Sequence, residues 1–410
     1  MGNSQGSERE RTACDIVISL PQTPLQGIRV LDLTTVVAGP FCTMILADLG
    51  AEIIKVERLD GGDDSRNMGP HLGPWGAYFV PLNRGKRSIA LDITQPKGRD
   101  AVLRLAKTCD VFVENFRGGK ASELLLDEAH IRAAKPGIIY ASLSAFGNGG
   151  PDYRKPGYDA LLQGRAGIMS VTGTDAQSTV RAGVSIVDMG AGMWLAMGVL
   201  AALLERQRTG RGQRVDSSLI ETGVMLMAYH LLYREFSGHN PTPQGTGHSA
   251  FAPYGAFKTA DGQIMIGISN DRLFQRLCTA IEKPGWLQDP LYCTNPLRVE
   301  HRPQLDAAIQ AILIQHNTAH WTAIFDEHDV PASAIQNAEQ VLNDAQVAAL
   351  GLLHEVSLGS AGQATVPQIP IHLSMTPPAI PGPPPALNQH AHEILIEAGF
   401  TRVEIEALLT

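Results

Sequence analysis

The first half of the chain alternates short apolar runs with longer segments that have one apolar face. The apolar runs expected to be strands are "GIRVLDL", "AEIIKVE", "SIALDI", "DVFVEN" and "KPGIIYASLS". Runs of this length predict strands that are buried on both faces. The segments between them, such as "PFCTMILADLG" with its early Pro and final Gly, predict helices. Strands that alternate with helices in this way indicate an α/β fold with a mostly parallel, doubly wound sheet.

The pattern changes in the second half of the chain. An apolar helix is predicted over Met189–Arg208, and a second one over "LIETGVMLMAYHLLY". A stretch rich in Gly, Pro and His follows, and then strands and helices that predict a smaller α+β domain. We therefore expect a disordered extension over 1–23, a large domain over 24–235 and a small domain over 245–330.

Composition narrows the possible functions. The 410 residues carry a net charge of −8, which argues against nucleic-acid binding. Five widely spaced cysteines without CxxC or Cys/His spacing predict neither a disulfide framework nor a metal site, and reduced thiols fit a cytoplasmic location. The longest uncharged apolar run, Met189–Leu204, is shorter than the roughly 20 residues of a membrane span, so no membrane association is expected.

Common nucleotide motifs are missing. The turn after the first predicted strand reads "LTTVVAGPFC", with one glycine, so the G-x-G-x-x-G fingerprint of dinucleotide-binding enzymes is not there. The sequence also contains no phosphate-binding G-x-x-x-x-G-K-[ST] and no G-x-S-x-G.

One carboxylate stands out. Asp188, in "AGVSIVDMGAGMW", precedes the predicted apolar helix, and no Lys or Arg occurs in the six residues after it. An aspartate there is commonly a helix cap. It can also be a reactive group that the positive end of the helix dipole keeps ionised, with Gly190 and Gly192 leaving room for a ligand. The residues alone leave both interpretations open.

Seven blocks in order give the chain a family resemblance. They include "GIRVLDLTTVVAGPFCTMILADLGAEIIKVER", "DVFVENFRGG", "GYDALLQGRAGIMSVTG" and "DMGAGMWLAMGVLAALLERQRTGRGQRVDSSLIE". From Leu25 to the C-terminus the chain resembles class III CoA-transferases of the CaiB–BaiF type, particularly those that use dicarboxylic acids of the succinate and glutarate kind. The resemblance implies a Rossmann-like large domain to which the chain returns over 335–410. It also implies an interlocked homodimer, CoA thioesters as substrates and no tightly bound cofactor.

The resemblance also implies roles for individual residues. Asp188 corresponds to the nucleophile, which forms a transient covalent bond with the acyl group. Tyr158 stands where the racemase branch of the family has a histidine base, which favours a transferase. Asp159 matches an acidic position close to the nucleophile, although it can equally be the cap of the following helix.

Other positions are implied to contact substrate. Val36 and Val37 supply backbone near the thioester. The residues implied to bind the nucleotide and phosphates of CoA are Arg58, Asn115, Phe116, Lys86 and Arg87. Arg66 and His248 are candidates for the acceptor acid, with "GTGHSAF" as a mobile cover. Surface charges in solvent are the ordinary alternative for the cations.

We therefore expect an acyl-CoA:carboxylate CoA-transferase. Two alternatives stay open on the sequence: an acyl-CoA racemase or isomerase with the same fold, and a non-catalytic CoA-binding protein.

Overall fold

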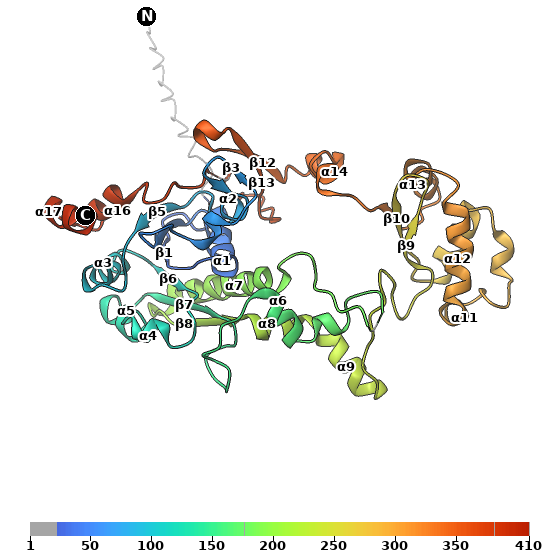
Figure 1. Ribbon diagram of the computed structural model, residues 1–410, viewed down its shortest axis with the longest axis horizontal. Coiled ribbons are helices and arrows are strands. Elements are labelled where there is room, and N and C mark those ends of the chain that lie inside the picture. Colours follow the sequence, from blue (N-terminus) through green and yellow to red (C-terminus); the bar gives the residue numbers. More distant parts are fainter. Residues whose placement is uncertain (1–22, 176, 381, 410) are drawn as a thin grey trace, which may run out of the picture.

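The computed structural model describes residues 23–175, 177–380 and 382–409. Its largest element is a parallel sheet of order β5-β2-β1-β6-β7-β8 (Figure 1). The strands are β1 (Arg29–Asp32), β2 (Glu52–Glu57), β5 (Arg87–Ala90), β6 (Val111–Glu114), β7 (Ile139–Ser144) and β8 (Arg214–Ser218). The order of the strands reverses between β1 and β6, which is where ligands commonly bind in open α/β sheets.

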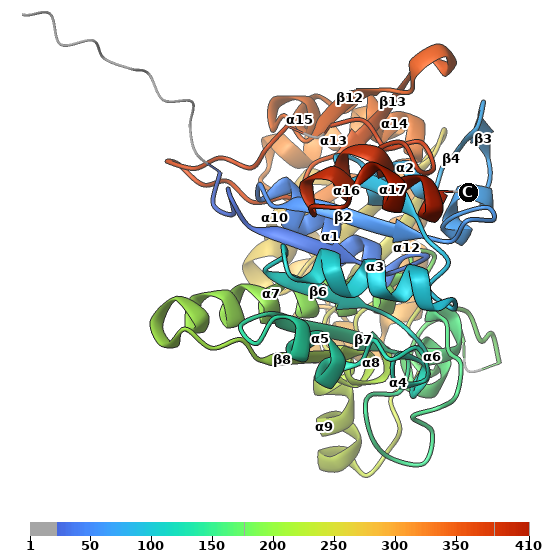
Figure 2. The ribbon, with the colours of Figure 1, turned by 90° about the vertical axis from the view of Figure 1, so that its left-hand side faces the viewer.

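Helices cover both faces of this sheet (Figure 2). On one face, α1 (Ala38–Asp48) and α7 (Ile186–Thr209) bury apolar side chains against the sheet. The other face is covered by α3 (Pro96–Ala106), α5 (Glu128–Ala134), α16 (Ala391–Glu397) and α17 (Arg402–Leu409). The last two helices show that the C-terminal segment packs on the large sheet, far from its neighbours in sequence.

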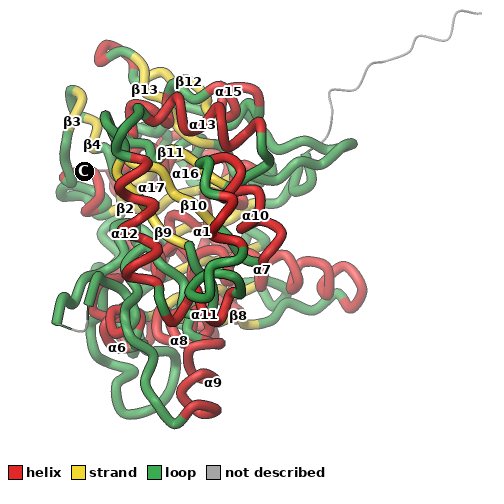
Figure 3. Tube along the Cα trace, turned by 90° about the vertical axis from the view of Figure 1, so that its right-hand side faces the viewer, coloured by secondary structure: helices red, strands yellow, loops and turns green. Residues whose placement is uncertain are grey.

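A second unit has its own sheet and core. β9 (Tyr254–Lys258), β10 (Gln263–Gly267) and β11 (Ala332–Ala334) form an antiparallel sheet. It packs among α10 (Asp271–Ala280), α12 (Arg302–Leu313) and α13 (Thr318–Glu327), as Figure 3 shows. Its strand β11 lies just beyond the range 245–330 expected for the small domain. The exact domain boundaries stay predictions, and the expected extension lies almost entirely outside the described residues.

Shorter elements complete the fold. β3 (His71–Leu72) pairs with β4 (Trp75–Gly76), and β12 (Leu353–Ser357) with β13 (Gln363–Pro367). The remaining helices are α2 (Phe79–Asn83), α4 (Lys120–Glu123), α6 (Asp159–Arg165), α8 (Leu219–Leu226), α9 (Ala228–Ser237), α11 (Asn295–Glu300), α14 (Ala338–Leu342) and α15 (Ala345–Ala349). Four 3₁₀ turns lie at Asp64–Asn67, Ile168–Ser170, Pro284–Leu287 and Gly359–Ala361.

Helix α7 differs from the sequence-based expectation in two ways. It spans 24 residues, so by length and composition it passes as a membrane span, but about half of its most apolar window is buried inside the protein, as in a core helix.

The glycines of α7 serve helix packing. A Cβ on Gly192 would lie 2.5 Å from the carbonyl oxygen of Ala38 in α1, and one on Gly190 would lie 2.8 Å from the Thr222 methyl group in α8. The expectation that they leave room for a ligand was therefore wrong.

Candidate active site

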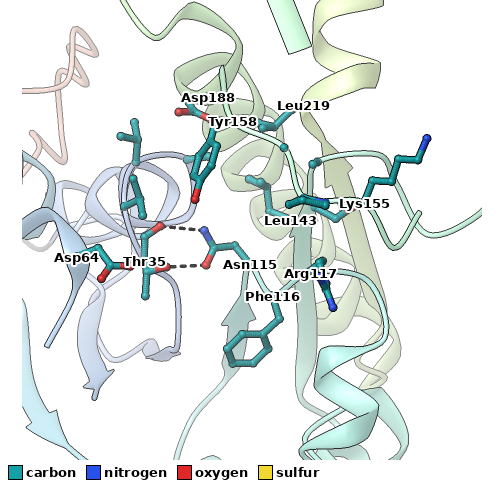
Figure 4. Close-up of a pocket in the computed structure, with 17 residues that line it drawn as sticks. Thr35, Asp64, Asn115, Phe116, Arg117, Leu143, Lys155, Tyr158, Asp188 and Leu219 are labelled. Carbon is teal, nitrogen blue, oxygen red and sulfur yellow. Dashed lines mark hydrogen bonds between the residues drawn. The ribbon is translucent and has the colours of Figure 1, made fainter. Parts of the chain in front are cut away.

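A cavity of about 230 Å³ opens at the carboxyl edge of the large sheet, where the strand order reverses. Its walls come from the segments that follow β1, β6 and β7, together with the start of α7. The lining residues are Thr35, Val36, Val37, Ala38, Asp64, Asn115, Phe116, Arg117, Leu143, Ser144, Ala145, Lys155, Pro156, Gly157, Tyr158, Asp188 and Leu219. In Figure 4, Asp188 and Tyr158 lie at one end of the cavity, and Phe116 and Arg117 lie toward the other.

Asp188 lies in the first turn of α7 and is half-buried in the cavity wall. Within the described part of the chain, its carboxylate accepts no hydrogen bond and forms no ion pair. It does not cap its own helix, because the helix begins at Ile186 and Ser185 holds the cap position. The interpretation of Asp188 as a helix cap was therefore wrong.

The N-terminus of α7 is capped by a different carboxylate. Asp159, buried at the start of α6, accepts hydrogen bonds through Oδ1 from the backbone N–H of Val187 (2.8 Å) and of Asp188 (3.2 Å). Gln163 donates to its other oxygen (2.5 Å) and accepts from the N–H of Ala182 (2.8 Å). Asp159 thus caps α7 from the neighbouring helix rather than capping α6.

This arrangement makes Asp188 a poorly stabilised anion. Burial, together with the negative charge of Asp159, raises the pKa of Asp188 to about 7. The sequence-based expectation that the helix dipole keeps this side chain ionised was wrong, because Asp159 takes the free amides. At neutral pH a substantial fraction of the Asp188 carboxyl is ionised but weakly solvated, which favours nucleophilic attack.

Five more of the predicted residues line the same cavity. Asn115 donates through Nδ2 to the carbonyl of Thr35 and accepts through Oδ1 from its N–H, both at 2.9 Å (Figure 4). Val36 and Val37 follow in the same turn, and Phe116 lies next to Asn115 on the opposite wall. Tyr158 also lines the cavity, with a largely exposed side chain.

Two of the residues predicted to contact CoA phosphates form ion pairs away from the cavity. The ammonium group of Lys86 is fully buried, 3.1 Å from a carboxylate oxygen of Asp32, and donates to Thr43 and Asn83 at 2.7 and 2.9 Å. Arg87 forms ion pairs with Glu52 and Glu397 near the C-terminal helix. Neither side chain lines the cavity. The prediction that they bind CoA phosphates was therefore wrong.

The remaining candidates also lie off the cavity wall. Arg66 is bound through two nitrogens to Glu57, both at 2.7 Å, so it is not a free receptor for a substrate carboxylate. Arg58 is exposed and pairs with Asp64, which does line the cavity. His248 packs against Phe251 and Tyr254 and lines a separate hollow beside α9.

Sequence reasoning missed several lining residues. Arg117 and Lys155 are the basic side chains among the residues that line the cavity, and Leu219 contributes to its apolar surface. Arg117 and Leu219 lie just beyond the ends of β6 and β8, and this position was the sequence signal that could have found them. Lys155 lies well beyond the end of β7, so no such signal marks it.

The fold and the cavity define an α/β enzyme with an unpaired carboxylate at the carboxyl edge of a parallel sheet. The model of CoA-transferase family III matches residues 25–391, and the chain belongs to this family.

Its relatives agree on the reaction. The chain is 38% identical to a succinyl-CoA:glutarate CoA-transferase of Mus musculus, over all of this chain and 93% of the relative. It is 35% identical to a succinate–glutarate CoA-transferase of Agrobacterium fabrum, over 91% of this chain and 95% of the relative. A CaiB/BaiF family protein from Brucella suis superposes with a TM-score of 0.84 at 33% identity, over 92% of this chain and all of that one. The protein is an enzyme that transfers CoA between acids.

The raised pKa of Asp188 predicts how stability depends on pH. The folded-state pKa is about 7, whereas an unfolded aspartate titrates near ~3.9. Between these values the folded chain binds more protons than the unfolded chain, so this residue lowers the free energy of unfolding as pH rises through the window. Asp188→Asn mimics the protonated form and should stabilise the protein at pH 8 by up to about 4 kcal/mol, and much less at pH 4.5.

Urea unfolding of both proteins at the two pH values measures this effect. Asp92→Asn is the control, because hydrogen bonds from Thr94 lower the pKa of that exposed carboxyl and the sign is reversed. An equal gain for Asp188→Asn at both pH values would contradict the prediction.

Proposed function

We propose that CoA transfer in this enzyme proceeds through covalent intermediates on Asp188. The observation that carries the proposal is the half-buried carboxylate of Asp188, which has no hydrogen-bond or ion-pair partner among the described residues and a pKa raised to about 7. An anion that lacks stabilising contacts is a stronger nucleophile than one that is hydrogen-bonded. Phe116, Leu143 and Leu219 add apolar surface that limits water around a hydrolysable anhydride.

The reaction divides into four balanced steps. An Asp188 oxygen attacks the thioester carbonyl of the donor, the C–S bond breaks, and CoA thiolate leaves a mixed anhydride. The thiolate attacks the aspartyl carbonyl, which releases the donor acid and forms an aspartyl–CoA thioester. The acceptor carboxylate then attacks this thioester and expels the thiolate again. Attack of the thiolate on the acceptor's carbonyl gives the new acyl-CoA and frees Asp188.

The surrounding residues fit an anionic thioester substrate. Arg117 and Lys155 supply positive charge at the cavity wall, and Asn115 fixes the opposing turn. These features favour the binding of CoA phosphates near Phe116 and of the thioester near Asp188. Tyr158 in place of a histidine base supports transfer over racemisation, since a phenol titrates about three units higher than imidazole.

We further propose that the large domain is Rossmann-like, in line with its reversed strand order, and that the active enzyme is a homodimer. Exposed apolar side chains gather on α7, α8 and α9: Met193, Trp194, Met197, Val224, Met225, Tyr229, Leu232, Tyr233 and Phe236. Helix α9 buries none of its own residues. Two extended connections join the β9–β11 unit to the large sheet (Figure 1), and a partner chain passing between them would give interlocked rings. The cytoplasmic location stays a prediction.

Incubation with succinyl-CoA followed by hydroxylamine should modify the peptide that contains Asp188, because both covalent intermediates react with amines. Mass spectrometry of the digested protein measures the modification. Asp188→Ala should abolish exchange and labelling with an unchanged circular dichroism spectrum. Asp64→Asn is the control, since it removes another cavity carboxylate and should leave the Asp188 peptide labelled. An unmodified Asp188 peptide in an active enzyme would refute the covalent route.

We expect small dicarboxylates to be the preferred acceptors. Two relatives are named as a succinyl-CoA:glutarate and a succinyl-CoA:mesaconate CoA-transferase. With succinyl-CoA as donor, glutarate and mesaconate should give kcat/KM at least about tenfold above acetate and butyrate, the size expected from one recognised polar group. Chromatography of the acyl-CoA products measures the rates. Equal rates for mono- and dicarboxylate acceptors would contradict the expected preference for dicarboxylates.

The dimer is tested by sedimentation. The wild type should sediment with twice the mass of the chain, and Tyr229→Glu/Phe236→Glu should weaken the association, because charges replace apolar side chains on α9. Val403→Glu, which changes an exposed apolar residue on α17, is the matched control and should not affect the mass. A monomeric, fully active wild type would contradict the proposal.

A further inference from the structure

The turn between β1 and α1 has an unusual backbone conformation. Val36 has a φ of 70°, in the left-handed region that β-branched residues avoid. Its neighbours Thr35 and Val37 line the same cavity as Asp188. Contacts from the surrounding structure must therefore hold this turn in place.

Side chains from four separate segments hold consecutive backbone groups of the turn. Asp32 accepts from the N–H of Thr34 at 2.8 Å, and Asn115 binds both backbone groups of Thr35. Lys55 donates to the carbonyl of Thr34 at 2.7 Å. The contact at the strained residue itself comes from Asp63, which accepts from the N–H of Val36 at 3.0 Å.

Asp63 is held in turn by a buried ion pair. The Nζ atom of Lys55 lies 2.8 Å from Oδ2 of Asp63, and both side chains are fully buried. Burial disfavours both charges, but the surrounding groups together outweigh it. Lys55 and the backbone N–H groups of Ser65 and Val36 lower the pKa of Asp63 to about 2, and Asp63, Asp32 and Glu57 raise the pKa of Lys55. Both groups stay charged across the physiological range.

Asp63 also joins two walls of the cavity. The next residue, Asp64, lines the cavity beside the turn and pairs with Arg58. The backbone N–H of Asp63 donates to Glu57 at 3.0 Å, which fixes this segment to the end of β2. A displacement of Asp63 would therefore move the Val36 turn and the Asp64 segment together.

We propose that Asp63, fixed by Lys55, is a positioning residue for CoA transfer: it holds Val36 in its left-handed conformation and so sets the cavity wall that receives the acyl-CoA. The inference rests on the proposal that acyl-CoA occupies the cavity of Asp188. Neither residue touches the reacting atoms; Asp63 acts through Val36.

A purely structural role is the alternative, since removing one partner of any buried ion pair destabilises a protein. The chain contains a matched pair for comparison. Arg84 lies 2.6 Å from Asp48, both are almost fully buried, and Asp48 lies at the end of α1 away from the cavity. Asp48→Ala therefore measures the effect of losing a buried ion pair that does not touch the turn.

The experiment compares Asp63→Ala in the wild-type and Val36→Gly backgrounds, with steady-state kinetics for succinyl-CoA and thermal unfolding of each variant. Asp63→Ala should raise KM for succinyl-CoA about tenfold or more, as expected for a displaced binding wall. Asp48→Ala should lower Tm comparably and leave KM within about twofold. Glycine adopts a positive φ without steric cost, so the effect of Asp63→Ala on KM should shrink to about threefold or less in the Val36→Gly background.

Each outcome decides the question. An unchanged KM in Asp63→Ala, an equal KM increase in Asp48→Ala, or the same effect in both backgrounds would overturn the inference. If Asp63→Ala does not fold, Lys55→Met/Asp63→Leu carries the same test without a lone buried charge. An active wild-type enzyme that shows no hydroxylamine labelling at Asp188 would instead overturn the covalent proposal. Failure of the positioning role of Asp63 and failure of the covalent route are therefore distinguishable.

Discussion

The covalent route proposed above depends on one electrostatic constraint: the carboxylate of Asp188 is partly buried and has no partner among the described residues. A helix N-terminus offers free amides that would stabilise it. Those of α7 bind Asp159 instead, and Gln163 holds Asp159 in place. The N-terminus of α7 therefore orients Asp188 without stabilising its charge. On the proposed route, the free energy that this anion costs the fold is the source of its reactivity.

Around the neighbouring turn that contains Val36, the buried charges are paired rather than isolated. Lys55, Asp63, Asp32 and Lys86 are fully buried, and each has an oppositely charged partner and further hydrogen bonds. Such groups add little net stability compared with apolar side chains, but their directional bonds favour one backbone geometry. Paired charges thus define the shape of one wall, whereas the carboxylate that we propose to react, Asp188, has no charged partner among the described residues.

The sequence predicted the parts of this arrangement that have local causes. Apolar runs separated by amphipathic segments indicated the parallel sheet. The isolation of Asp188 from cations along the chain was also visible. The partners of buried charges were not. Lys86, just before β5, meets Asp32 at the end of β1, and Arg66, in the 3₁₀ turn after β2, folds back onto Glu57 at the end of that strand. In sequence, "GKRS" and "DDSRN" look like solvated loops, and only the folded structure shows that Lys86 and Arg66 face these carboxylates. The cap of α7 was missed for the same reason, since Asp159 lies 29 residues before Asp188.

Tyr158 lines the cavity with a largely exposed side chain, and this bears on how the proposed covalent route avoids hydrolysis. On that route, a mixed anhydride on Asp188 must be kept from water between the departure of one acid and the arrival of the next. The segment expected to cover the site, around His248, packs against aromatic side chains beside α9 instead. Helix α9 presents apolar side chains that a single chain would not benefit from exposing. In the proposed dimer, a second chain on this face would bury those side chains and bring additional surface close to Tyr158, so association and protection of the intermediate would have a common physical origin.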